Sequence, residues 1–316
     1  MKVFNVDEAD ISLNGDIDLS HLKTFGSYQS LSSATTDQII NQGKESNIIV
    51  VNKALITKEI FENLPDLRLI AISATGINNV DINAAKKTNV LVSNVRGYAE
   101  DTVPQHTLAL ILNLATKTHL YAKDVDQGHW EKSSSFTLLR YPTFELKGKT
   151  IGIIGFGSIG YKVAKLAEAF GMHVIVTSRS EIKDPRYTNV PLDDLLQESD
   201  IVTIHCPLTE ETKDLISHDE LLLMKPTGYL INTSRGGIVN EVALANALNK
   251  EKIAGAGIDV LTAEPPSSGN ILLQTKNIII TPHSAWSTRQ ARQKLIDETV
   301  VNIRSFIKGQ PRNVVT

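Results

Sequence analysis

The chain has 316 residues, of which 41% are hydrophobic and 21% charged, with a formal net charge of -3 at pH 7. This length exceeds what one compact core usually holds, so we expect two domains. The small net charge and the lack of a long basic run give no electrostatic reason to expect nucleic-acid or membrane binding. The single cysteine, Cys206, excludes an intramolecular disulfide and any metal site built from cysteines. The polar start of the chain and the lack of a long apolar run predict a cytoplasmic protein.

Strand-like runs alternate with helix-like runs from one end of the chain to the other. This alternation is typical of parallel sheets that carry helices on both faces. The runs form two groups, so the sequence predicts an α/β protein with two doubly wound parallel-sheet domains. Strands of the first group are expected at residues 2–6, 48–51, 69–73 and 90–93, with a helix such as 57–63 between them. Strands of the second group are expected at residues 149–154, 173–177, 201–205, 229–232, 254–258 and 278–281.

Two further helical segments organise the chain. Residues 101–118 form an apolar helical pattern that links the two groups, with Asp101 as the expected N-cap and Pro104 tolerated in the first turn. The amphipathic segment 288–307 is expected to return to the first domain, which would bring the termini close together. The polar, serine-rich segment 131–137 is expected to be a surface loop.

The most specific local pattern is a glycine-rich turn between a predicted strand and a predicted helix. It consists of Gly155, Phe156, Gly157, Ser158, Ile159 and Gly160. Gly155 allows the tight turn, Gly157 lets the backbone approach a pyrophosphate, and Gly160 lets the helix pack against the strand. The N-terminus of the helix supplies free N–H groups for the phosphates. The pattern predicts a Rossmann dinucleotide-binding domain.

The choice of dinucleotide depends on the end of the next strand. In NAD sites an acidic residue about 20 positions after the glycines accepts hydrogen bonds from the ribose hydroxyls. This chain has Ser178 and Arg179 there and no carboxylate. A guanidinium and a hydroxyl suit a 2′-phosphate, so NADP(H) is favoured over NAD(H), and use of both remains open. The alternative is that Arg179 is a solvated loop residue.

Ligands of parallel sheets bind beyond the carboxyl ends of the strands, and reactive side chains follow several predicted strands of the second group. Arg235 would bind a substrate carboxylate through two hydrogen bonds and polarise the adjacent carbonyl. His283 would give a proton to the carbonyl oxygen during reduction and take it back during oxidation. Glu264 would bind the imidazole and stabilise its protonated form, and Asp259 would accept a hydrogen bond from the nicotinamide carboxamide.

Each of these residues also has a purely structural interpretation. Arg235 is a candidate for a surface ion pair, Glu264 for a solvated turn acid, and His283 for a turn histidine with a backbone partner. His205 and Cys206 suit a loop that contacts the cofactor better than a nucleophilic pair, because no third group is evident to support one. The remaining histidines lack the spacing of metal ligands, so no metal site is predicted; those interpreted as structural or exposed are His106, His119 and His129.

Several segments together resemble the D-isomer-specific 2-hydroxyacid dehydrogenase family, and the likeness runs from about Asn47 to the C-terminus. The segments are 155–160 (GFGSIG), 205–209 (HCPLT), 224–226 (MKP), 232–241 (NTSRGGIVNE), 257–260 (GIDV) with Glu264 and Pro265, and 282–286 (PHSAW). The resemblance implies a Rossmann NAD(P)-binding domain over residues 100–285 and a discontinuous, flavodoxin-like substrate domain from residues 1–99 and 286–316. It also implies an active site in the cleft between them and a homodimer formed largely through the nucleotide domain.

The resemblance also assigns roles to individual residues. It implies Arg235, Glu264 and His283 as the catalytic trio, with Arg235 and His283 also contacting substrate. The remaining implied contacts are Ala74, Thr75 and Gly76 for the substrate carboxylate, and His205, Cys206, Pro207, Thr233 and Ser234 for the cofactor. Two departures stand out: Pro104-Gln105 replaces the Ala-Glu of many members, and Ser178-Arg179 replaces the acid that selects NAD.

Residues 52–53 and 285–286 resemble the glycerate dehydrogenase and hydroxypyruvate (glyoxylate) reductase branch more than D-lactate dehydrogenases. We therefore expect NAD(P)H-dependent reduction of hydroxypyruvate or glyoxylate to the D-2-hydroxy acid. A 3-phosphoglycerate dehydrogenase is the weaker alternative, since only Lys53 and Arg96 offer extra cations near the substrate loop. A reductase of a bulkier 2-oxo acid is another alternative. A nucleotide-sensing corepressor without catalysis is a third, and the complete trio disfavours it.

Overall fold

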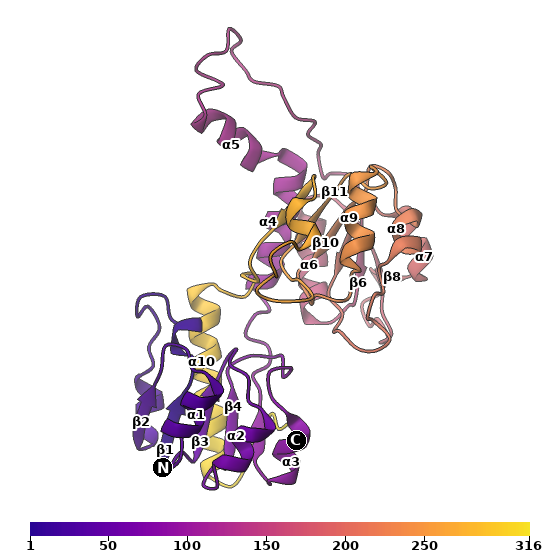
Figure 1. Ribbon diagram of the computed structural model, residues 1–316. Helices are drawn as coiled ribbons and strands as arrows, with labels where there is room; N and C mark the ends of the chain where they lie inside the picture. Colours follow the sequence, from indigo (N-terminus) through magenta and orange to yellow (C-terminus); the bar gives the residue numbers. More distant parts are fainter. The chain divides into compact units, whose positions relative to one another are not determined.

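In the computed structural model, which describes residues 1–316, the chain forms two compact units (Figure 1). The first unit combines Met1–Ala99 with Ser287–Thr316, and the second is Glu100–Trp286. Trp286, which we expected to open the last segment of the first domain, therefore belongs to the second unit. Each unit contains one parallel sheet with helices on both faces, so the predicted α/β class is confirmed.

The first unit has a five-stranded parallel sheet in the order β2-β1-β3-β4-β5. Its strands are β1 (Lys2–Asn5), β2 (Ser27–Ser30), β3 (Ile48–Val51), β4 (Leu69–Ile72) and β5 (Leu91–Ser93). This is the flavodoxin-like order of doubly wound sheets. The edge strand β2 is not among the predicted strands, because it reads Ser-Tyr-Gln-Ser, is largely exposed and carries no apolar pattern.

Two apolar layers cover the sheet of the first unit. The helical elements are α1 (Thr36–Gln42), α2 (Lys58–Asn63), α3 (Ile82–Lys87), α10 (Arg289–Ile307) and the short 3-10 helices η1 (Glu8–Asp10) and η2 (Ser20–Phe25). Side chains of α1, α2 and α3 pack on one face. On the other face, Ile296, Val300 and Ile303 of α10 pack against the strands. After α10 the chain returns to the sheet, where the Val315 N–H donates to the carbonyl of Val92.

The second unit has a seven-stranded parallel sheet in the order β12-β11-β10-β9-β6-β7-β8. Its strands are β6 (Thr150–Ile154), β7 (His173–Thr177), β8 (Thr188–Asn189), β9 (Ile201–Ile204), β10 (Tyr229–Asn232), β11 (Gly255–Ile258) and β12 (Ile278–Ile280). The strand order reverses between β6 and β9, as in Rossmann folds, and ligands of such sheets bind at this switch point. The two-residue strand β8 is exposed and was not predicted.

Helices of the second unit again form two layers, each with its own apolar core. They are α4 (Thr102–Thr116), α5 (Thr118–Asp126), α6 (Ser158–Ala169), α7 (Leu192–Glu198), α8 (His218–Leu223), α9 (Glu241–Asn249) and the 3-10 helix η3 (Ile271–Gln274). Asp101 is the N-cap residue of α4, as predicted, but its side chain does not cap the helix. Asp101 has helical backbone angles and makes no capping hydrogen bond, and its carboxylate lies 2.6 Å from the Lys162 ammonium.

The predicted helix at 101–118 is interrupted at Lys117, which has a φ of 54° and separates α4 from α5. From this point α5 and the following loop project from the body of the second unit as an arm (Figure 1). We define the arm as residues 118–145. It contains the predicted surface loop 131–137, which is mostly exposed. None of the helices combines the length and the apolar composition that crossing a membrane requires.

Candidate active site

The glycine-rich turn joins β6 to α6 at the switch point of the second sheet. Gly155 has a φ of +91°, and a Cβ there would lie 2.5 Å from the backbone nitrogen of Cys206. A Cβ on Gly160 would lie 2.2 Å from the carbonyl oxygen of Gly155, whereas a Cβ on Gly157 would meet nothing within 4 Å. Gly157 is also the N-cap of α6 and offers no side-chain cap, so the N–H groups of the first turn remain for an anion. The turn therefore fits the pyrophosphate of a dinucleotide.

Ser178 and Arg179 follow β7 at the carboxyl edge of the same sheet. The Ser178 N–H donates to Oδ1 of Asn189 at 3.0 Å, which anchors the start of this loop. The Arg179 guanidinium reaches Oε2 of Glu211 at 2.8 Å, and both side chains are more than 70% exposed. Glu211, which is not among the predicted site residues, brings a carboxylate to Arg179 from the loop after β9.

The loop after β9 contains His205, Cys206 and Pro207. The His205 N–H donates to the carbonyl of Ile154 at 2.7 Å, and its Nε2 lies 2.9 Å from Oγ1 of Thr203. Burial lowers the pKa of His205 to about 3, so this imidazole is neutral near pH 7. Burial also raises the pKa of the Cys206 thiol, although Arg179 opposes that effect. A neutral imidazole and a protonated thiol do not form a nucleophilic pair.

Thr233, Ser234 and Arg235 follow β10. Ser234 Oγ donates to the carbonyl of Cys206 at 2.5 Å, which ties this loop to the loop after β9. Thr233 Oγ1 lies 2.9 Å from Oγ1 of Thr107 on α4. The half-buried Arg235 donates through Nη1 to the carbonyl of Ser234 at 2.8 Å and forms no ion pair with a carboxylate of the protein. Its charge is therefore available to an external anion.

His283 and Glu264 come together although 19 residues separate them in the chain. His283 Nδ1 lies 2.5 Å from Oε2 of Glu264, whose Oε1 accepts the N–H of Leu261 at 2.9 Å. Both side chains are partly exposed. Because Glu264 holds Nδ1, the imidazole proton lies there in the neutral form and Nε2, which has no protein partner, can accept or donate a second proton.

The backbone that carries His283 is held in an uncommon conformation. His283 has a φ of 51°, a left-handed value that few residues other than glycine adopt. Its N–H donates to the carbonyl of Asp259 at 2.8 Å. The carboxylate of Asp259 accepts the N–H groups of Ser284 at 2.9 Å and Ala285 at 3.0 Å, and Oγ1 of Thr281 at 2.5 Å. Asp259 is only 1% exposed, so in this structure it organises the His283 turn.

His106 was interpreted from the sequence as structural or exposed. The structure places its Nε2 3.0 Å from Oγ1 of Thr281 and 3.5 Å from Oδ1 of Asp259. His106 thus belongs to the hydrogen-bond network behind His283. Its position on α4, away from any strand end, gave no signal in the sequence. No group of three His, Cys, Asp or Glu side chains in the structure has the arrangement of a metal site.

The loop predicted to hold a substrate carboxylate lies in the first unit, directly after β4. Ala74, Thr75 and Gly76 form a bend at the carboxyl end of that strand. Oγ1 of Thr75 donates to the carbonyl of Val95 at 2.8 Å, which ties the bend to the segment after β5.

Comparisons with known proteins show the family of the chain. Residues 108–285 match the family model described as D-isomer specific 2-hydroxyacid dehydrogenase, NAD binding domain. A glycerate dehydrogenase of Methylorubrum extorquens is 42% identical over 286 residues, which cover 90% of each chain. The chain belongs to the D-isomer-specific 2-hydroxyacid dehydrogenase family. It is an oxidoreductase of that family, and the glycine-rich turn lies in its NAD-binding domain.

Other relatives show how far the similarity extends. A hydroxypyruvate reductase of Blautia hydrogenotrophica is 37% identical over 309 residues, which cover 95% of each chain. An acyclic imino acid reductase solved in complex with NADPH and D-Arg superposes with a TM-score of 0.87 at 30% identity, over the full length of both chains. The two relatives named glycerate dehydrogenase and hydroxypyruvate reductase confirm the resemblance of the sequence to that branch of the family.

Proposed function

We propose that this dehydrogenase reduces a small 2-oxo acid, with hydroxypyruvate or glyoxylate as the best candidates, to the D-2-hydroxy acid. The observation that carries the proposal is the pairing of His283 with Glu264, which leaves Nε2 without a protein partner. Relatives named glycerate dehydrogenase and hydroxypyruvate reductase, which align over 90% or more of this chain, support the choice of substrate.

In the proposed reaction the bound dinucleotide, when reduced, supplies the hydride to the carbonyl carbon of the substrate. His283 Nε2 donates a proton to the carbonyl oxygen, and the carboxylate of Glu264 stabilises the imidazolium that gives it up. Arg235, which has no carboxylate partner in the protein, binds the substrate carboxylate and orients the carbonyl. In the opposite direction His283 accepts the hydroxyl proton. The backbone amides of Ala74, Thr75 and Gly76 supply further contacts to the carboxylate.

We also propose that the enzyme prefers NADP(H) over NAD(H). The support is the absence of a carboxylate at the end of β7 and the presence of Arg179 there. Glu211 opposes this preference because it pairs with Arg179, and a 2′-phosphate would have to displace it. Asp259 as a partner of the nicotinamide carboxamide stays a prediction, as do the cofactor contacts of the other loop residues. A cytoplasmic location stays a prediction of the sequence.

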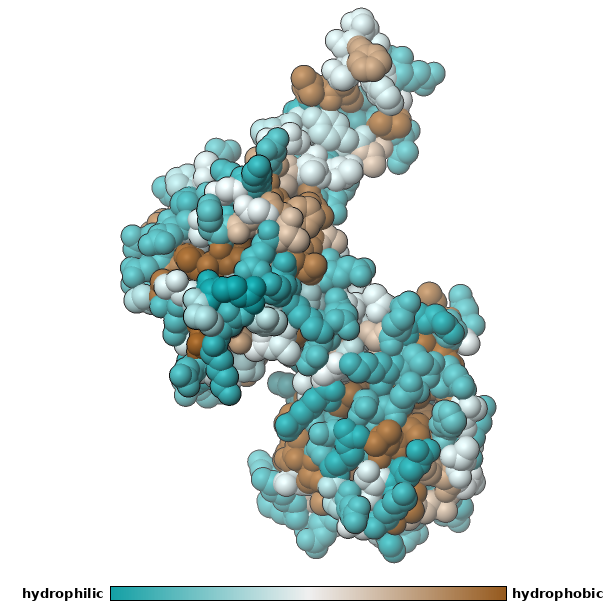
Figure 2. Space-filling model, turned by 180° about the vertical axis from the view of Figure 1, so that it is seen from behind, coloured by the Kyte–Doolittle hydropathy of each residue, from teal (hydrophilic) through white to brown (hydrophobic).

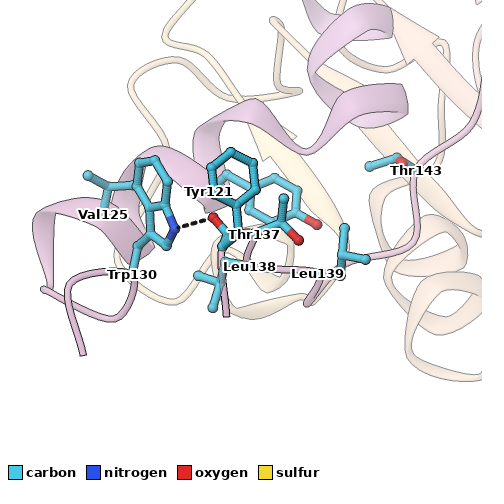
Figure 3. Close-up of a pocket in the computed structure, with 8 residues that line it drawn as sticks. Tyr121, Val125, Trp130, Thr137, Leu138, Leu139 and Thr143 are labelled. Atoms are coloured by element: carbon cyan, nitrogen blue, oxygen red, sulfur yellow. Dashed lines mark hydrogen bonds between the residues drawn. The ribbon is translucent and has the colours of Figure 1, made fainter. Parts of the chain in front are cut away.

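The arm supports a homodimer formed largely through the nucleotide-binding unit. Phe136 and Leu139 are 91% and 89% exposed, and they line an apolar hollow on the arm together with Trp130 and Val125 (Figure 3). The indole N–H of Trp130 donates to the carbonyl of Phe136 at 3.1 Å, which gives this loop a defined shape (Figure 3). Large apolar side chains this exposed are typical of surfaces that a partner covers.

A second apolar surface of the same unit could receive the arm of another copy. It is a groove between α4 and α6, lined by Leu108, Ala109, Leu112, Leu166 and Phe170 among others. Hydrophobic surface of this unit also extends to the base of the arm (Figure 2). The partner we propose is therefore a second copy of the chain.

Initial rates test the proposed reaction. NADPH and NADH oxidation would be followed by absorbance with hydroxypyruvate, glyoxylate, pyruvate and 3-phosphohydroxypyruvate. We expect the fastest turnover with hydroxypyruvate or glyoxylate. Turnover confined to 3-phosphohydroxypyruvate would establish the phosphoglycerate alternative. Tight dinucleotide binding without turnover of any 2-oxo acid would favour the non-catalytic alternative.

A further inference from the structure

The bend after β4 has three successive backbone carbonyls, and each accepts a hydrogen bond from a neighbouring segment. The carbonyl of Ser73 accepts Nδ2 of Asn52, which follows β3. The carbonyl of Ala74 accepts the N–H of Val95 at 2.9 Å. The carbonyl of Thr75 accepts Nδ2 of Asn94 at 2.7 Å. Two asparagine side chains and one backbone amide thus hold the whole bend.

These three bonds determine where the amides of the bend point. In a planar trans peptide the carbonyl of one residue and the N–H of the next point in opposite directions. Holding the carbonyls of Ser73, Ala74 and Thr75 against the protein therefore turns the next N–H groups away from those neighbours. These are the N–H groups of Ala74, Thr75 and Gly76, and none of them donates to another group of the protein.

We propose that Asn94 and Asn52 are positioning residues that present these three amides to the substrate carboxylate. The proposal rests on the proposed function, because it takes the bend as the carboxylate-binding loop. Successive free N–H groups form a concave site that favours anions. An asparagine is suited to this task since it donates to the carbonyl without adding a negative charge beside the anion.

Asn94 is itself firmly held, which makes it an effective support. Its side chain is buried, and its backbone carbonyl accepts Nδ2 of Asn302 on α10 at 2.8 Å. Its N–H donates to the carbonyl of Asn313 at 3.2 Å, and Nδ2 of Asn313 donates to Oδ1 of Asn302 at 3.2 Å. The last helix and the C-terminal segment thereby support the bend from more than 200 residues away in the chain.

Asn52 is held in a comparable way. Its N–H donates to the carboxylate of the buried Asp7, at 2.8 Å to Oδ1. The same carboxylate accepts the N–H groups of Lys53 at 2.6 Å and Ala54 at 2.8 Å. Asp7 thus fixes the turn after β3 so that the Asn52 amide faces the carbonyl of Ser73.

The decisive variant is Asn94→Ala, with Asn47→Ala as the matched control. Asn47 also donates through Nδ2 to a backbone carbonyl, that of Asp66 at 3.3 Å, but at the opposite end of the same sheet. Thr75→Val is a second test, because it removes only the hydroxyl that ties the bend to Val95 and the side chain is exposed. For each protein we would measure kcat and KM with hydroxypyruvate, the Kd of NADPH, and the Kd of oxamate at saturating NADPH.

We expect Asn94→Ala to raise KM and the oxamate Kd about fivefold, the effect of losing one hydrogen bond, with the NADPH Kd and kcat within about twofold of wild type. Thr75→Val should raise KM and the oxamate Kd about two- to threefold, and Asn47→Ala should change neither of these two values. A folded Asn94→Ala with unchanged KM and oxamate Kd would overturn the proposal. If Asn94→Ala does not fold, unchanged values in Thr75→Val would overturn it instead. A wild-type protein that neither turns over a 2-oxo acid nor binds oxamate would overturn the proposed function, and the positioning role with it.

Discussion

The contact between Arg179 and Glu211 leads to a quantitative prediction about cofactor preference. Both side chains are more than 70% exposed, so breaking the pair costs about 0.5 kcal/mol. Hydrogen bonds from Arg179 to a 2′-phosphate contribute about 1.5 kcal/mol, the lower end for charged pairs, because the site is open to water. The net gain from Arg179 is then about 1 kcal/mol, or roughly fivefold in the Kd of NADPH.

Two variants separate these contributions. Arg179→Ala should weaken NADPH binding about fivefold, because the net gain is lost. Glu211→Gln should tighten NADPH binding about twofold, because the phosphate no longer competes with a carboxylate for the guanidinium. Neither variant should change the Kd of NADH by more than about twofold, since NADH has no 2′-phosphate.

Fluorescence titration of both variants with NADPH and NADH at low and high salt provides the measurement. The effect of each variant on the Kd of NADPH relative to that of NADH should shrink at high salt, because exposed charges are screened. If Arg179→Ala raises the Kd of NADPH and the Kd of NADH by the same factor, Arg179 does not contact the 2′-phosphate. If Glu211→Gln raises the Kd of NADPH, the Glu211 carboxylate supports NADPH binding rather than competing with the phosphate for Arg179.

Three further predictions concern the site and the arm. Asp259→Asn should lower the free energy of unfolding by about 2 kcal/mol, because a buried acceptor of two backbone N–H groups becomes partly a donor. The same change should lower kcat at least tenfold. Thermal unfolding and initial rates measure the two effects, and a fully active, stable variant would contradict the role given to Asp259. Replacing Phe136 and Leu139 together by Asp should convert the proposed homodimer into monomers in light scattering, and a dimer that persists would place the interface elsewhere. The lowered pKa of His205 means that the unfolded chain binds its proton below about pH 6.5 while the folded chain does so only near pH 3, so stability should fall as the pH drops through this window. His205→Gln should reduce that loss in urea unfolding at pH 7.5 and 5.0, and an unchanged pH dependence would show that folding does not lower the pKa of His205.

The sequence predicted the elements whose signal is strong and local. The central strands of both sheets are apolar runs buried on both faces, and all were found. The edge strands β2 and β8 were missed because their residues are polar and largely exposed. The break at Lys117 was also missed, since neither glycine nor proline marks it.

The candidate site was partly predictable for a topological reason. Parallel strands bring their carboxyl ends to one edge, so the sequence was enough to place Arg235 and His283, each of which follows a strand, at the same edge. The contact between Glu264 and His283 was also predicted, from their chemistry, and the fold brings the two side chains together across 19 residues of the chain. His106 and Glu211 could not be predicted, since one lies on a helix and the other in a loop whose path the sequence does not specify.

The proposed proton transfer from His283 to the 2-oxo acid is tested most directly by comparing three proteins. Steady-state NADPH oxidation with hydroxypyruvate would be measured for the wild type, for His283→Ala and for the control His218→Ala, which changes an exposed histidine of α8. We predict that His283→Ala lowers kcat at least a hundredfold while the Kd of NADPH stays within about twofold, and that His218→Ala matches the wild type. A His283→Ala variant that keeps wild-type turnover would contradict the account.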